Sequence, residues 1–171
     1  MQSNKRSNRA RRVALCGVLC ALALVFGYIE HLLPLPIGIP GVKLGLANLV
    51  TLLLLYLTDA KTAFSVNLIR ILLSGLLFGS AVSLSYSLAG GLLAFFAMLL
   101  IKKLGCFSTV GVSLCGGIAH NVGQMAVAAF LVSELRILLY LPILLIAGTL
   151  TGFLLGLCGT LILKRYQSQN K

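Results

Sequence analysis

Residues 63–78 read AFSVNLIRILLSGLLF, a long apolar run with one arginine, Arg70, near its middle. A guanidinium at membrane depth is costly unless it is paired or hydrated. The chain has only three acidic residues, Glu30, Asp59 and Glu134, and each is expected at or near a helix end. We therefore expect Arg70 to be satisfied by backbone carbonyls and amide side chains, or by the anionic part of a ligand.

The composition of the whole chain indicates that lipid is its solvent. Of the 171 residues, 59% are hydrophobic and 10% are charged, and the mean hydropathy is +1.05. A soluble domain has about a quarter of its residues charged, so this chain could not cover a surface in water. Only helices and closed barrels satisfy the backbone in a bilayer core. Because the apolar runs lack strand alternation, we expect an all-α integral membrane protein.

Six apolar runs predict a bundle of six transmembrane helices. They cover residues 12–33, 44–57, 62–79, 82–101, 109–133 and 138–163. The second run is short, so five spans are the alternative. The seam at Ser80 and Ala81 fits either a tight hairpin or a re-entrant turn. We expect a basic N-terminal segment at 1–11, a membrane domain at 12–163 and a basic tail at 164–171.

The formal net charge of +11 is placed unevenly. Eleven of the 14 Lys and Arg residues lie before or at the start of the first run, at Lys61, at Lys102 and Lys103, or after the sixth run. With six spans these positions share one side of the membrane, which is the positive-inside pattern. We therefore expect a multi-pass protein of the cell membrane with cytoplasmic termini, an uncleaved first helix, and contact with anionic lipid rather than nucleic acid.

Two features have both a functional and a packing interpretation. The apolar loop from Pro34 to Pro40 is either a lid over a pocket or a packed connector. Glycines recur every four residues from Gly148 to Gly156, and Gly17 and Ala21 have the same spacing. Such small residues allow close approach between helices of one bundle or between two membrane proteins.

Polar side chains recur at helical spacing in the predicted spans. Asn67, Arg70 and Ser74 share one helix face, as do His120 and Gln124. Polar groups in spanning helices normally face the bundle interior, so we expect one cluster without a carboxylate. It is either a binding site in which Arg70 contacts an anion or a network that only holds the helices together. The predicted substrate-binding residues are Lys43, Asn48, Asn67, Arg70, His120, Asn121 and Gln124.

Catalysis has little support in this sequence. There is no Asp-rich Mg²⁺ motif, no nucleophile with a base and no phosphate-binding loop, so we expect neither an enzyme nor a cofactor. Cys16 and Cys20 share a helix face, but no second pair completes a tetrahedral metal site. We expect the cysteines to be small packing residues. Without an ATPase signature, energised transport would depend on a partner or an ion gradient.

Four motifs in order resemble a known family: VKLGLAN at 42–48, RILLSGLLFG at 70–79, YSLAGG at 86–91, and the polar stretch from 107 to 124. They closely resemble the Gx transporter family, also known as heptaprenyl diphosphate synthase component I. The transporter name is similar to the substrate-binding S components of energy-coupling factor (ECF) uptake systems. The resemblance implies six helices, an outer pocket, and a first-helix face, here Gly17 and Ala21, that docks a coupling subunit working with ATPases.

Two hypotheses follow from the residues and the resemblance together. In the first, the protein is an S-component-like binding protein for uptake of a small anionic or vitamin-like molecule. In the second, which the synthase name implies, it has a role in making the menaquinone side chain. Because the chain lacks the aspartates that hold Mg²⁺ on a diphosphate, that role would be a non-catalytic membrane subunit of a prenyl synthase or of a redox assembly.

Overall fold

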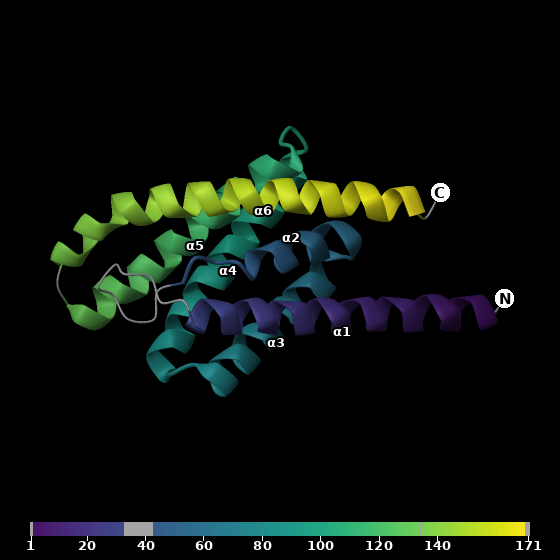
Figure 1. Ribbon diagram of the computed structural model, residues 1–171, viewed down its shortest axis with the longest axis horizontal. Coiled ribbons are helices and arrows are strands. Elements are labelled where there is room, and N and C mark those ends of the chain that lie inside the picture. Colours follow the sequence, from purple (N-terminus) through teal and green to yellow (C-terminus); the bar gives the residue numbers. More distant parts are fainter. Residues whose placement is uncertain (1, 33–42, 134, 170–171) are drawn as a thin grey trace.

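A computed structural model describes residues 2–32, 43–133 and 135–169. These residues form six α-helices and one short 3₁₀ helix, η1, and no strand occurs among them (Figure 1). The helices are α1 (Gln2–Leu32), α2 (Asn48–Leu57), α3 (Ala60–Phe78), α4 (Ala81–Leu104), α5 (Thr109–Val132), η1 (Leu135–Tyr140) and α6 (Leu141–Gln169). The predicted loop from Pro34 to Pro40 lies outside the described residues.

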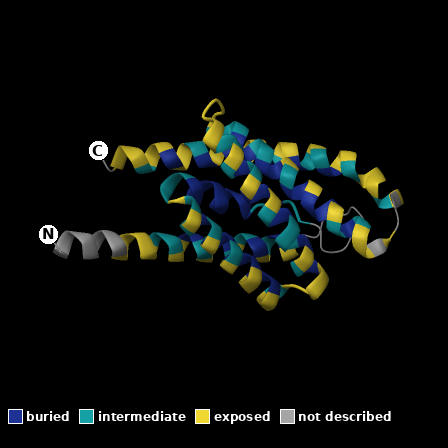
Figure 2. Ribbon diagram, turned by 180° about the vertical axis from the view of Figure 1, so that it is seen from behind, coloured by how far each residue is buried: buried dark blue, intermediate teal, exposed yellow. Residues whose placement is uncertain are grey.

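The outer surface of the bundle is apolar, as expected for a protein solvated by lipid. Among the described residues, five helices (α1, α3, α4, α5 and α6) are long and apolar enough to cross a membrane. Large apolar side chains such as Leu76, Phe130 and Ile146 are mostly exposed on their outward faces (Figure 2). In water this surface would be unstable. The prediction of an all-α multi-pass membrane protein is confirmed.

The short helix α2 lies at the centre of the bundle. It contacts each of the other five α-helices in the described part of the chain, and all its residues from Asn48 to Leu55 are buried. Its 10 residues extend over only about 15 Å, half of a bilayer core of about 30 Å. The helix itself begins at Asn48, four residues after the start of the predicted second span. Gly45 has φ +87°, which breaks the helix before Asn48.

Charged side chains from two other helices bind the two ends of α2. At its N-terminal end, the Glu30 carboxylate of α1 accepts hydrogen bonds from the backbone amides of Gly45 and Leu46. At its C-terminal end, the Lys102 ammonium of α4 donates to the Leu55 carbonyl and lies 4.7 Å from the centre of the Tyr56 ring. The helix dipole favours a negative charge at the N-terminal end and a positive charge at the C-terminal end. Glu30 and Lys102 therefore stabilise the position of this short helix.

Four of the other helices form two hairpins, α3 with α4 and α5 with α6. Only Gly79 and Ser80 join α3 to α4, and the Ser80 side chain accepts from the Ser83 amide, so a tight turn connects the two helices. Between α5 and α6, a Cβ added at Gly117 would lie 2.3 Å from the Gly148 carbonyl oxygen. The glycines of α6 therefore pack within the bundle. Both chain ends lie at the same end of the molecule (Figure 1).

Candidate functional site

A small interior cavity lies beside the N-terminal end of α2. Its volume is about 20 Å³, room for roughly one water molecule. The segment from Lys43 to Ala47 forms one wall, and helices α1, α3, α4 and α5 supply the others. The lining residues are Gly27, Glu30, Lys43, Gly45, Ala47, Arg70, Ile71, Ser74, Ser87 and His120.

Arg70 is buried, and the groups that bind it are neutral. Its Nε and Nη2 atoms donate to the Asn67 side-chain oxygen at 3.0 and 2.8 Å. The Thr51 hydroxyl donates to the same oxygen at 2.9 Å and accepts from Nη2 at 3.4 Å. Asn67 is itself oriented by a bond from its amide nitrogen to the Gly91 carbonyl, at 3.3 Å. Amide and hydroxyl oxygens thus bind Nε and Nη2 of the guanidinium without cancelling its charge.

The cavity contains a carboxylate, which corrects the prediction of a cluster without one. Glu30 is 8% exposed and lines the cavity together with Arg70 and Lys43. Among the described residues, no ion pair within 4 Å joins Glu30 to either cation. Its Oε1 atom instead accepts both backbone amides at the start of α2. Glu30 does lie near a helix end, but the chain after residue 42 returns and covers that end.

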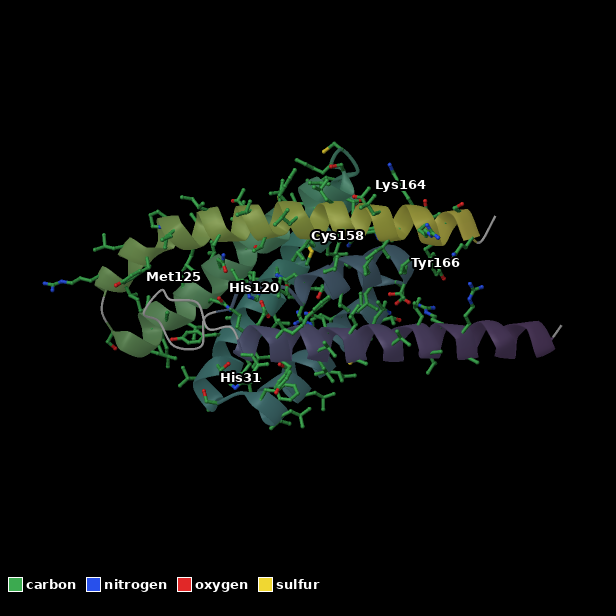
Figure 3. The ribbon with its side chains drawn as sticks, in the orientation of Figure 1. His31, His120, Met125, Cys158, Lys164 and Tyr166 are labelled. Atoms are coloured by element: carbon green, nitrogen blue, oxygen red, sulfur yellow. The ribbon has the colours of Figure 1, made fainter. Side chains whose placement is uncertain are left out.

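Lys43, Gln124 and His120 form a hydrogen-bonded chain across the cavity wall. The Lys43 backbone amide donates to the Gln124 side-chain oxygen at 3.2 Å, and the Gln124 amide nitrogen lies 3.0 Å from His120 Nε2. An amide nitrogen can only donate, so Nε2 accepts and a neutral ring carries its proton on Nδ1. Figure 3 shows His120 on α5, turned to the interior of the bundle.

The charges around the cavity leave an excess of one positive unit. Arg70, Lys43 and Glu30 all line the cavity. When all three side chains are ionised, two cations face one carboxylate. An anion of single charge would make the group neutral.

Several buried polar atoms at the site have no hydrogen-bond partner among the described residues. They are both amide atoms of Asn48, the Ser87 hydroxyl and Nδ1 of His120. An unsatisfied buried polar group costs about 1–3 kcal/mol, so this set can hold a polar ligand or water. Asn48 and His120 pack closely against Gly45, which has no side chain. A Cβ at this position would lie 2.9 Å from the Asn48 amide nitrogen and 3.1 Å from the His120 ring.

The structure brings most of the predicted residues together, with clear exceptions. Lys43, Arg70 and His120 line the cavity, and Asn67 and Gln124 bind the residues that do. Asn121 turns instead to α6, where its amide donates to the Leu144 carbonyl. Gly17 and Ala21, predicted to dock a partner, are exposed on α1, and a Cβ at Gly17 would meet nothing within 4 Å.

Three side chains at or beside the cavity were not in the predicted binding set: Glu30, Thr51 and Ser87. Thr51 follows Asn48 at a spacing of three on a helix, and Ser87 lies in the YSLAGG motif, so both carried a signal in the sequence. Nothing in the local sequence places Glu30 at the cavity, because its contacts depend on where the chain returns 15 residues later.

Comparison with known proteins gives one family and no individual relative. A family model described as heptaprenyl diphosphate synthase component I matches residues 19–162. This range includes every residue that lines the cavity and all the helices except residues 2–18 of α1 and residues 163–169 of α6. No curated protein and no solved structure matches the chain.

Proposed function

The chain belongs to the heptaprenyl diphosphate synthase component I family, and from its buried site we propose that it binds a small anionic molecule inside the membrane, as an S component of an uptake system does. The observation that carries the proposal is Arg70, a buried guanidinium whose contacts are neutral oxygens. A charge kept in a low-dielectric interior without a contacting counter-ion is a functional-site signal in a membrane protein.

In this proposal the ligand anion lies between Arg70 and Lys43. The Asn48 amide, the Ser87 hydroxyl and the His120 Nδ1–H are the groups available to orient the rest of the ligand. Glu30 is a positioning residue, because it holds the N-terminal end of α2 and so sets where Asn48 lies. The cavity volume of about 20 Å³ means that a vitamin-sized ligand enters only if the walls move apart.

The proposed topology has six crossings with both termini cytoplasmic. Residues 43–57 supply the second crossing: the ten-residue helix α2 extends over about 15 Å, and the non-helical Lys43–Ala47 segment continues from its N-terminal end. Non-helical backbone is tolerated at membrane depth where it lines a cavity, as the Lys43–Ala47 segment does. The common end of both termini in Figure 1 and the distribution of basic residues support this arrangement.

The partner in this proposal is a membrane coupling subunit with its ATPases. The exposed small residues Gly17 and Ala21 of α1 are the proposed docking face, since small residues let a second helix approach closely. The role is binding and not catalysis.

The test is mass spectrometry of the small molecules that the gently purified protein retains. We expect the wild-type protein to retain an anionic solute, Arg70→Met to lose it, and the control Arg136→Met to retain it, because Arg136 is an exposed residue of η1. The proposal is wrong if no anion is retained by the wild type, or if Arg70→Met and wild type retain the same one.

The family description supports a second candidate function, a non-catalytic membrane subunit of a prenyl diphosphate synthase. Affinity purification of the tagged protein from its own membranes separates the two candidates. A soluble prenyl synthase in the eluate supports the second function, and an ATPase with a membrane coupling subunit supports the first.

A further inference from the structure

The charged residues that line the interior cavity come from three separate parts of the chain. Glu30 lies on α1, Lys43 precedes α2, and Arg70 lies on α3. In the part of the chain that the structure describes, no ion pair within 4 Å joins any two of them. The three charges therefore surround the cavity without contacting one another, and each of them acts on whatever the cavity holds.

Close packing between α1 and α3 brings the carboxylate and the guanidinium to facing helix surfaces. A Cβ added at Gly27 of α1 would lie 2.8 Å from the hydroxyl oxygen of Ser74 on α3. Gly27 is three residues before Glu30, and Ser74 is four residues after Arg70, so each shares a helix face with the charged residue. Glu30 and Arg70 thus lie on the faces that the two helices turn towards each other.

Backbone contacts hold the Glu30 carboxylate at the cavity. It is buried and accepts from the backbone amides of Gly45 and Leu46. Turning away from a ligand would leave both amides without this acceptor, which is costly for buried groups. The negative charge of Glu30 is therefore a fixed property of the cavity wall.

The charge balance of the cavity depends on the charge of its ligand. The His120 ring is neutral, since its Nε2 atom accepts from the Gln124 amide, so the wall carries two cations and one carboxylate. A ligand with one negative charge brings the sum to zero. A ligand with two leaves a negative charge uncompensated in a low-dielectric interior, where such a charge is strongly disfavoured.

We propose that Glu30 is a specificity-determining residue, through which the site binds anions of single charge more tightly than dianions. This inference rests on the proposed function, because it assumes that an anion binds between Arg70 and Lys43. It narrows the ligand class to monoanions such as monocarboxylates. It excludes dicarboxylates and phosphate monoesters, which carry about two charges at neutral pH.

The experiment compares the binding of succinamate and succinate to the purified full-length protein at neutral pH, by titration with saturation-transfer difference NMR. The two molecules have the same carbon chain, but succinamate has an amide where succinate has its second carboxylate. We expect the wild type to bind succinamate about tenfold more tightly than succinate. Glu30→Gln keeps an acceptor oxygen for the backbone amides and should reverse the preference by about the same factor.

Two further variants separate charge from structure. The double variant Glu30→Gln with Lys43→Gln has the wild-type sum of charges and should prefer succinamate again, which a purely structural role of Glu30 does not predict. The matched control is Asp59→Asn, which changes the protein by the same unit of charge at a half-exposed position away from the cavity. Its preference should stay within about twofold of wild type.

The outcomes distinguish this inference from the proposed function. The same preference in wild type and Glu30→Gln would overturn the inference, as would an equal change of preference in Asp59→Asn. If the wild type binds both molecules, Arg70→Met binds neither and Glu30→Gln leaves the preference unchanged, the anion site stands and only its charge selection by Glu30 is wrong. If the wild type binds neither molecule, the inference also fails, and the retained-solute experiment decides the proposed function separately.

Discussion

Two arginines, Arg70 and Arg12, show how differently this chain treats the same side chain. Arg70 is buried at the centre of the bundle and is bound by the neutral oxygens of Asn67 and Thr51. Arg12 is 50% exposed at one end and forms an ion pair with Asp59. The exposed arginine has a contacting carboxylate, although water would have sufficed, and the buried one has none. The comparison teaches that the charge of Arg70 is kept available, while that of Arg12 is used to join α1 to the start of α3.

We expect the largest loss of stability from Asn67→Leu, which changes the surroundings of the buried arginine, Arg70. The substitution removes the oxygen that accepts from Nε and Nη2 of Arg70 and from Thr51. A buried charge left without its partner costs about 3 kcal/mol or more. Equilibrium unfolding in mixed micelles should show this loss.

Its control is the double variant Asn67→Leu with Arg70→Met. Replacing both partners by apolar groups is far less destabilising than removing one, so the double variant should recover most of the lost stability. Equal instability of the single and double variants would mean that the loss does not come from an uncompensated Arg70.

The next effect concerns Glu30, the carboxylate that lines the cavity with Arg70. Glu30→Leu removes the acceptor for two backbone amides at the start of α2 and should lower stability by about 2 kcal/mol. Glu30→Gln keeps an acceptor oxygen and should lower it by less than half as much. If the two variants are equally unstable in the same unfolding assay, the negative charge matters more than the hydrogen bonds.

A smaller effect is expected at the other end of α2. Lys102→Met keeps the apolar stem but removes the ammonium that binds the Leu55 carbonyl and the Tyr56 ring. We expect a loss of about 1 kcal/mol, and Lys103→Met, on an exposed neighbour, should have almost none. Hydrogen exchange of the α2 amides in both variants would locate the effect, and equal protection in Lys102→Met and wild type would contradict it.

The smallest effect should come from the exposed arginine. Asp59→Asn keeps a side chain that caps helices well and removes only the charge paired with Arg12. Because both side chains are about half exposed, we expect a loss below about 1 kcal/mol, decreasing further at high salt. A loss as large as that of Asn67→Leu would remove the distinction between the two arginines.

Helical spacing in the sequence predicted much of the fold and part of the site. The apolar runs gave the long helices, and spacings of three and four correctly paired Asn67 with Arg70 and His120 with Gln124. Asn121 follows His120 directly, so it is turned by about 100° around the helix and contacts α6 instead. The same spacing argument therefore accounts for its position outside the cavity.

The sequence could not predict the contacts between the end of α1 and the segment before α2, because they depend on the chain reversing its direction. The burial of Glu30 depends on Gly45 adopting a positive φ and on the residues beside it returning over the end of α1. The apolar run from Leu44 to Leu57 has the pattern of a continuous helix. Helix propensity describes only the local sequence, so it does not include the Glu30 acceptor on α1. The late start of α2 is thus a tertiary effect at a site that the local pattern describes as continuous helix.

The bond between the Lys43 backbone and Gln124 has a consequence for how the protein is made. These residues are 81 positions apart, so the ribosome has released α1 to α4 before the second partner emerges. Until α5 enters the membrane, the segment before α2 has no Gln124 to bind and the wall that carries His120 is missing. The proposed binding site is therefore assembled late in biosynthesis, and a nascent chain becomes competent for ligand only after most of its helices have been inserted.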